Sequence, residues 1–227
     1  MHRSLVVSLA LLAIVRAPAV AQTCQGLASF SSGQMQTTGN VSFGNGMNAF
    51  GATFAYGQSA GAFGGIGIGT TSIDALNGSS FDVGVAGGFQ MTTGKAKKIH
   101  LCPVANLGLG MGPKNVGGSG VDMSSTTGGM GFDLGTSLPG GPRMQIIPTG
   151  GLGVEYLKVK ADNGTTTSSA SDTYGVMNLG VGFLFNSQIA VRPLISIPLG
   201  LNGGETSFGL TVGYNFGNKG AATGRRR

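Results

Sequence analysis

Charged side chains are scarce in this chain, and so are the residues that build most catalytic and metal sites. Only 10% of the 227 residues are charged, tryptophan is absent, and there are two cysteines and two histidines. A soluble surface normally carries more charge. Apart from residues 5–15, no apolar run approaches the roughly 18 residues that a membrane helix requires. These absences argue against a cysteine-rich metal site and against a helical membrane protein.

Glycine is abundant instead, with 44 residues, and the N-terminus has the order of a secretory signal peptide. Arg3 precedes the apolar run 5–15, and the small residues 19–21 follow it. We therefore predict that residues 1–21 are a signal peptide and that the mature chain begins at Gln22. The protein is then exported, with enough chain left for one sizeable domain.

Positive charge is concentrated at the C-terminus. Removing Arg3 and Arg16 with the signal reduces the 14 basic residues to 12, against 8 acidic ones. Lys219 and the arginines 225–227 account for that whole excess. We interpret residues 218–227 as a basic flexible tail, with contact to an acidic polymer as the alternative. Aromatic residues do not interleave with basic patches, so no nucleic-acid partner is expected.

The mature chain alternates large apolar residues with polar or small ones, and no stripe of helical period interrupts it. Phe81, Val83 and Val85 share one face, for example, while Asp82 lies on the other. Most of the alternating segments are long enough to cross a bilayer at a tilt. We predict ten strands, at residues 34–43, 47–58, 61–72, 80–92, 97–110, 123–137, 143–158, 173–185, 189–199 and 206–217.

Length, alternation and loop pattern together favour a closed transmembrane barrel over a β-sandwich. The connections alternate between longer and shorter ones, as in barrels with long outer loops and short periplasmic turns. An even number of strands returns both chain ends to the periplasm, and closure removes exposed edges. We therefore expect an all-β, closed antiparallel up-and-down transmembrane barrel over residues 34–217, preceded by a periplasmic segment 22–33.

The final strand carries the most specific signal, the stretch FGLTVGYNFG at residues 208–217. Its apolar residues alternate and finish in an aromatic. This pattern resembles the C-terminal strand of bacterial outer-membrane β-barrel proteins, although here GNKGAATGRRR follows the aromatic. The resemblance implies an outer-membrane location, with outer-membrane lipid and the barrel-assembly machinery as partners. The residues that carry it are Phe208, Leu210, Val212, Tyr214 and Phe216.

Prolines inside the predicted strands argue against ten strands, because a paired strand loses a hydrogen bond at each proline. Either bulges absorb them or there are fewer strands, with eight possible. Residues 138–142 read as a turn, and 111–122 and 159–172 read as loops rich in Gly, Ser or Thr. The prolines concerned are Pro103, Pro148, Pro193 and Pro198.

Charged residues on the inward-facing side of the barrel form the main candidate site. His100, Asp133, Arg143 and Arg192 fall toward the periplasmic end of the lumen, whereas Asp82 and Glu155 lie higher. Burying such charges unpaired costs several kcal/mol. We expect the lower cluster to be a salt-bridged plug that stabilises the barrel; a charge-selective constriction is the alternative.

Cys24 and Cys102 are the only cysteines, and an even pair in an exported chain favours a disulfide. Strand phase places Cys102 on the inward face near the periplasmic end. The bridge would then fold the segment 22–33 across the barrel mouth. No small-residue motif precedes Cys24, so a lipid anchor is not expected.

The mature chain contains few residues of the types that support catalysis. His100 is the only histidine of the mature chain, and it does not lie in an outer loop, where barrel enzymes of this class place theirs. The glycines match no phosphate-binding spacing, so we expect neither an enzyme nor a cofactor nor a metal. We expect a structural or surface-interaction role, for which no extracellular ligand is indicated. A narrow pore for water, ions or small solutes is the alternative, and a soluble secreted β-protein a weaker one.

Overall fold

The computed structural model describes residues 23–27, 34–44, 46–58, 61–93, 99–201 and 204–216. The predicted signal peptide 1–21 and the tail 218–227 lie outside the described residues.

Within these residues, twelve antiparallel strands form one sheet, and ten of them are long. The long strands are β1 (Gln34–Gly44), β2 (Met47–Gly57), β3 (Ala62–Ile73), β4 (Gly78–Phe89), β6 (Ile99–Met111), β7 (Asp122–Thr136), β9 (Met144–Asp162), β10 (Thr167–Phe185), β11 (Ile189–Leu199) and β12 (Ser207–Phe216). The short strands are β5 (Met91–Thr93) and β8 (Leu138–Gly141). The ten predicted strands are all present.

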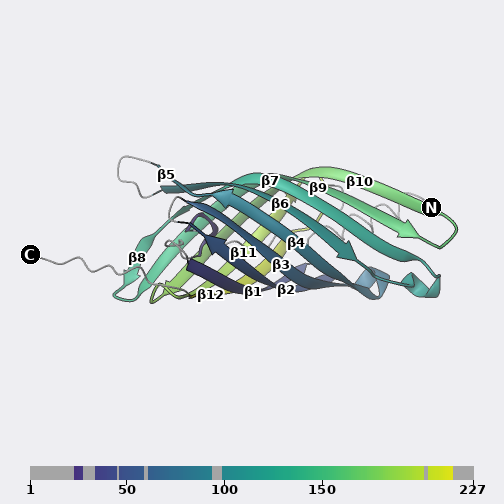
Figure 1. Cartoon of the computed structure of the whole chain (residues 1–227), viewed down its shortest axis with the longest axis horizontal. Helices are drawn as coiled ribbons and strands as arrows, with labels where there is room; N and C mark the ends of the chain where they lie inside the picture. The colour runs from purple at the N-terminus through teal and green to yellow at the C-terminus, as the bar shows by residue number, and fades with distance from the viewer. Residues whose placement is uncertain are drawn as a thin grey trace, which may run out of the picture.

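Each long strand pairs with its neighbours in sequence, and β12 pairs with β1, so the sheet closes (Figure 1). This confirms the closed antiparallel up-and-down barrel and decides for ten strands over eight. We call the end where β1 begins and β12 ends the terminal end. The other, distal end carries the hairpin between β9 and β10 and the short 3-10 helices η3 (Asp74–Leu76) and η4 (Val116–Gly118).

The strand registers determine the width of the barrel. Followed once around the ring, the pairings return to β1 displaced by about 12 residues. Ten strands with that stagger tilt by about 40° and enclose a backbone cylinder about 10 Å in radius. A cylinder of this size is filled only where its inward side chains are large.

Three of the four prolines interrupt pairing without bulging the strands, whereas Pro198 stays paired with Val176 of β10. The β4–β6 pairing stops at Gly88 and resumes, as β5, in the same register beyond Pro103. Pro148 likewise separates β7 from β8, and Pro193 leaves a gap between β10 and β11. Each of the three keeps a partner on its other side, as expected for a residue without an N–H. Neither bulges nor a smaller number of strands is therefore needed to accommodate these three prolines.

Two predicted connections are wrong. Residues 138–141 are strand β8, and the turn lies after them. Much of the predicted loop 159–172 is also strand, since β9 and β10 pair as far as Asp162 and Thr167. The remaining turn is closed by Asn163, whose side-chain oxygen accepts hydrogen bonds from the backbone N–H groups of Thr165 at 3.0 Å and Thr166 at 2.7 Å. The predicted loop 111–122 is a loop that contains η4.

Large apolar side chains cover the outside of the barrel. Ile66 is 62% exposed, Leu107 64% and Met130 72%. A soluble protein rarely shows so continuous an apolar surface, whereas a bilayer removes it from water. The soluble alternative required this face to be a core, so that alternative is wrong. None of the helices in the described part of the chain is long and apolar enough to cross a membrane.

The signature residues of β12 also face outward. Phe208, Leu210, Val212, Tyr214 and Phe216 alternate with the inward-facing residues of the strand. The ring of Phe216 lies 6.0 Å from that of Phe54 on β2 and 6.4 Å from that of Tyr214, which groups aromatic rings at the terminal end. Recognition of this strand by the assembly machinery stays a prediction.

We expect Leu107→Arg to lower the free energy of unfolding by about 2–4 kcal/mol, because the guanidinium would lie in hydrocarbon. The matched control is Thr165→Arg in the exposed β9–β10 turn, which we expect to be neutral. Urea unfolding from lipid vesicles measures both. Equal stability of the two variants would show that the outer face of β6 is not in lipid.

Candidate functional site

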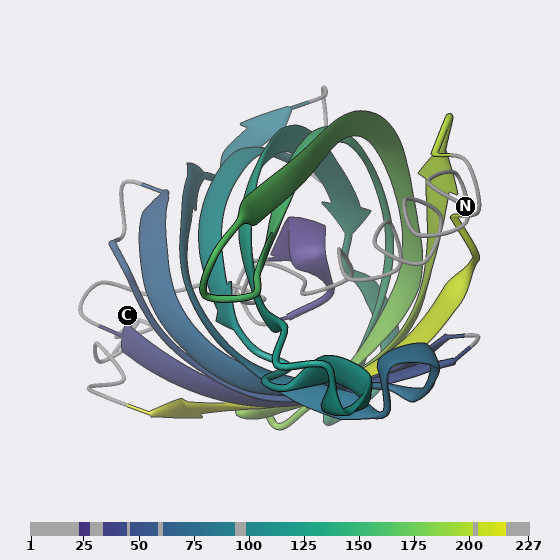
Figure 2. The same ribbon diagram turned by 90° about the vertical axis from the view of Figure 1, so that its right-hand side faces the viewer.

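The lumen contains a segment from the N-terminal side of the barrel. Thr23–Leu27, the plug segment, begins with the 3-10 turn η2 (Thr23–Gln25), which contacts β6, β7 and β9. Figure 2, viewed along the barrel, shows η2 in purple inside the ring of strands. All five residues are buried. The segment was expected across the barrel mouth, and it lies inside.

A disulfide ties the plug segment to the wall. Cys24 is bonded to Cys102 of β6, with the two Cα atoms 6.1 Å apart, within the usual range for a disulfide. Both cysteines are completely buried. The structure therefore contains the predicted bridge, and it joins positions 78 residues apart in sequence.

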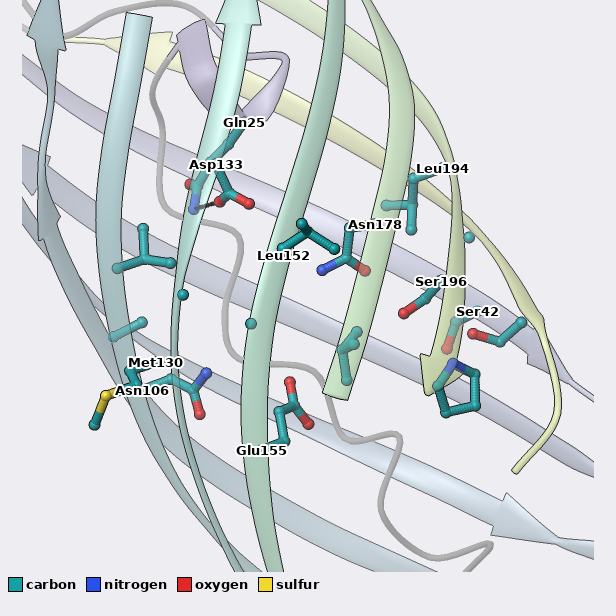
Figure 3. A pocket seen from close by; sticks show the side chains of 18 of the residues that line it. Gln25, Ser42, Asn106, Met130, Asp133, Leu152, Glu155, Asn178, Leu194 and Ser196 are labelled. Atoms are coloured by element: carbon teal, nitrogen blue, oxygen red, sulfur yellow. Dashed lines mark hydrogen bonds between the residues drawn. The ribbon is translucent and has the colours of Figure 1, made fainter. Parts of the chain in front are cut away.

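Polar contacts hold the plug segment on two further sides. The side-chain amide of Gln25 donates a hydrogen bond to the carboxylate of Asp133 on β7 at 2.9 Å (Figure 3). The backbone N–H of Thr23 donates to the side-chain oxygen of Gln90 at 3.1 Å. Asp133 is half-buried, and a carboxylate withdrawn from water needs such donors, so Asp133 and the plug segment stabilise each other.

Arg192 of β11 lies against the same segment and is only 9% exposed. Its aliphatic carbons pack beside Gly26, and its guanidinium donates to the hydroxyl of Thr149 at 3.5 Å. The guanidinium interacts electrostatically with Asp133. Its Nε has no hydrogen-bond partner within the described part of the chain. Asp133 and Arg192, two members of the predicted lower cluster, thus both lie against the plug segment.

The other two members lie elsewhere. His100 is placed near the terminal end, where its ring pairs with the hydroxyl of Thr92 at 3.4 Å across β5 and β6. Arg143 lies in the exposed turn between β8 and β9, and its carbonyl accepts the backbone N–H of Asn186 at 2.8 Å. The structure does not bring these side chains to the plug segment.

Glycines of the wall make room for the plug segment. A Cβ on Gly182 of β10 would collide with the carbonyl oxygen of Gly26. A Cβ on Gly135 of β7 would collide with the carbonyl oxygen of Thr23 and lie 2.8 Å from the Cα of Cys24. The plug backbone therefore occupies the space that side chains would otherwise take.

The two upper acids are both held by hydroxyl groups. Asp82 is 3% exposed and accepts hydrogen bonds from Thr71 at 3.0 Å and Ser80 at 3.2 Å. Glu155 accepts a hydrogen bond from Tyr174 at 3.2 Å. Both lie on the distal side of the plug segment. The described residues contain no cluster of three or more His, Cys, Asp or Glu arranged to hold a metal ion.

A cavity of about 170 Å³ begins at the plug segment and runs toward the distal end (Figure 3). Gln25, Asp133 and Arg192 line its lower part, and Leu201, Glu205 and Ser207 line its upper part. A second cavity of about 50 Å³ lies beside Asp82 and shares Asn40, Ser42 and Asn106 with the first.

Sequence reasoning missed the roles of Gln25, Thr149 and the two wall glycines. The alternation along β7 and β10 shows that Gly135 and Gly182 face inward, and this was the one sign in the sequence of space within the lumen. Nothing in the sequence shows which segment uses the space they leave.

We expect Gly182→Ala to displace the plug segment, because overpacking costs about 1–3 kcal/mol. Hydrogen exchange at residues 23–27 should accelerate by about 5- to 160-fold. Gly39→Ala is the matched control, since a Cβ at Gly39 meets nothing within 4 Å. Unchanged exchange in folded Gly182→Ala would contradict the position of the plug segment.

We also expect Asp133→Asn and Arg192→Met to be coupled. Each single change leaves the other charge without its partner in the lumen, whereas the double variant removes both charges. The coupling energy in a double-mutant cycle of urea unfolding should be about 1–3 kcal/mol. Additive effects would show that the two charges do not interact across the plug segment.

No protein-family model and no curated protein matches the chain. Among solved structures, the N-terminal β-barrel domain of Pseudomonas aeruginosa OprF is similar at 12% identity and TM-score 0.38, covering 82% of this chain and 98% of that one. Ail, the attachment invasion locus protein of Yersinia pestis, is similar at 11% identity and TM-score 0.42, and the match covers 82% of this chain and 99% of that one. The β domain of the Bordetella autotransporter Brka is similar at 13% identity and TM-score 0.49, and the match covers 81% of this chain and 98% of that one. These values identify no family, so the barrel architecture is established by the closed pairing of this chain's own strands.

Proposed function

We propose that this protein is a closed-lumen barrel of the bacterial outer membrane with a structural or surface-interaction role. The observation that carries the proposal is the buried plug segment, which fills the lumen where an open pore would need a passage. The apolar exterior supports insertion into lipid, and the short turns of the terminal end support a periplasmic position for that end.

The distal end supports a role at the cell surface. β11 ends at Leu199 and β12 begins at Ser207, but β9 and β10 continue to pair as far as Asp162 and Thr167. β10 pairs with β11 only from Gly175 onward. One side of the wall therefore rises above the other as a hairpin, and its β10 strand carries mainly exposed Thr, Ser and Asp side chains. Polar, exposed segments raised on a rigid barrel are suited to contact with other molecules.

An enzymatic role is not part of the proposal. Asp133 is held by Gln25, Asp82 and Glu155 are held by hydroxyl groups, and His100 lies near the terminal end of the barrel, opposite the distal loops. A general acid or base needs a position next to substrate. The narrow-pore role is the second candidate, and the cavity above the plug segment is the observation that favours it.

Thiol labelling of intact cells tests the orientation. We expect Thr165→Cys, in the β9–β10 turn, to react with a membrane-impermeant maleimide in intact cells. Arg143→Cys, in an exposed turn of the terminal end, should react only after the outer membrane is opened. The wild-type protein provides the background, because both of its cysteines are buried in the disulfide. The reverse pattern would contradict a surface role for the distal end.

A further inference from the structure

The barrel wall does not fill its own lumen at the level of the plug segment. Ala55 and Ala190 join Cys24 and Leu27 in one buried cluster. Gly135 and Gly182 lie against the plug backbone, and a Cβ on Gly213 would lie 3.5 Å from Leu27. The same cluster includes the large wall residues Phe63, Ile147 and Leu184, but the glycine positions leave the space that the plug backbone occupies. Withdrawal of residues 23–27 would therefore leave an opening.

The space above the plug segment already reaches from that level to the distal end. The cavity of about 170 Å³ touches Gln25 of the plug segment at one end and Glu205 at the other. Polar residues such as Asn40, Asn178 and Ser196 line it along its length, together with apolar side chains. The plug segment separates this space from the terminal end.

Acidic groups outnumber basic ones along the cavity. Asp133, Glu155 and Glu205 line it, and Arg192 is the basic residue among its lining residues. Asp82 adds a further carboxylate beside the adjoining small cavity. Carboxylates around a narrow passage attract cations and repel anions. A path through this lumen would favour small cations.

The disulfide is the strongest of the described restraints on the plug segment. Besides it, the segment makes the hydrogen bonds of Thr23 and Gln25 and the apolar contacts of Leu27. The completely buried sulfurs are protected from dissolved thiols while the plug segment is in place. The bridge therefore acts as a latch that keeps the lumen closed.

We propose that the plug segment is the stopper of a cation-preferring pathway, held in place by the Cys24–Cys102 bridge. Release of the plug segment turns the closed barrel into a pore for small cations such as hydrated alkali ions. This goes beyond the structural or surface role proposed above, because it gives the lumen an activity of its own.

Planar-bilayer recording of full-length protein tests the proposal. We expect no steps from the wild type, and intermittent openings from Cys24→Ser combined with Cys102→Ser. Adding Gly182→Ala to the serine pair should raise the open probability at least tenfold, because it pushes the freed plug segment from its place. Adding Gly39→Ala instead is the matched control, and it should leave the openings of the serine pair unchanged. A shift in gel mobility between unboiled and boiled samples confirms that each variant is folded.

Selectivity is read from the reversal potential in a KCl gradient. We expect the released variant to prefer K⁺ over Cl⁻, and Glu155→Gln with Glu205→Gln to reduce that preference at least twofold. Folded, released variants without conductance would overturn the proposal, as would a preference for Cl⁻. Wild-type conductance equal to that of the released variant would show that the plug segment is not a stopper. The surface role is judged separately, by the labelling of Thr165→Cys.

Discussion

Closure of the hydrogen-bonded sheet is the constraint on which the rest of the structure depends. In a bilayer the backbone finds no water, so every spanning strand needs a neighbour on both sides. The pairings of β12 with β1 and of β9 with β10 complete the ring. Closure divides the side chains into a lipid-facing set and a lumen-facing set, which explains the alternation along each strand. Strand number and register then set the width of the lumen, and with it the space that must be filled.

The plug segment is the consequence of that width. Because residues 135 and 182 are glycines, the wall has no side chains there to fill the lumen. Residues 23–27 occupy that space instead. The disulfide, Gln25 with Asp133, and Arg192 beside Gly26 hold this segment at three places around the ring. The charges of the lower lumen thus stabilise a stopper, while the acidic residues above it line a space that reaches the distal end.

The sequence predicted the wall of the barrel well, because lipid and lumen impose a period of two on every strand. It also predicted the pairing of Cys24 with Cys102, since both phase and export pointed to it. Composition misled where Thr and Ser replaced apolar residues: 159–172 reads as a loop, yet β9 and β10 extend through most of it. The contact of Gln25 with Asp133 joins residues 108 positions apart, and no local pattern encodes it. Arg143 was assigned inward by its position, but a turn places it outside the lumen.

The central claim is that these strands close around a lumen within the outer membrane. Isolated outer membranes, compared with and without boiling on a denaturing gel, test it most directly. The account predicts that the protein remains in the membrane fraction and migrates faster without boiling, because a closed barrel stays compact in detergent. A protein found in the soluble fraction, with the same mobility before and after boiling, would contradict it.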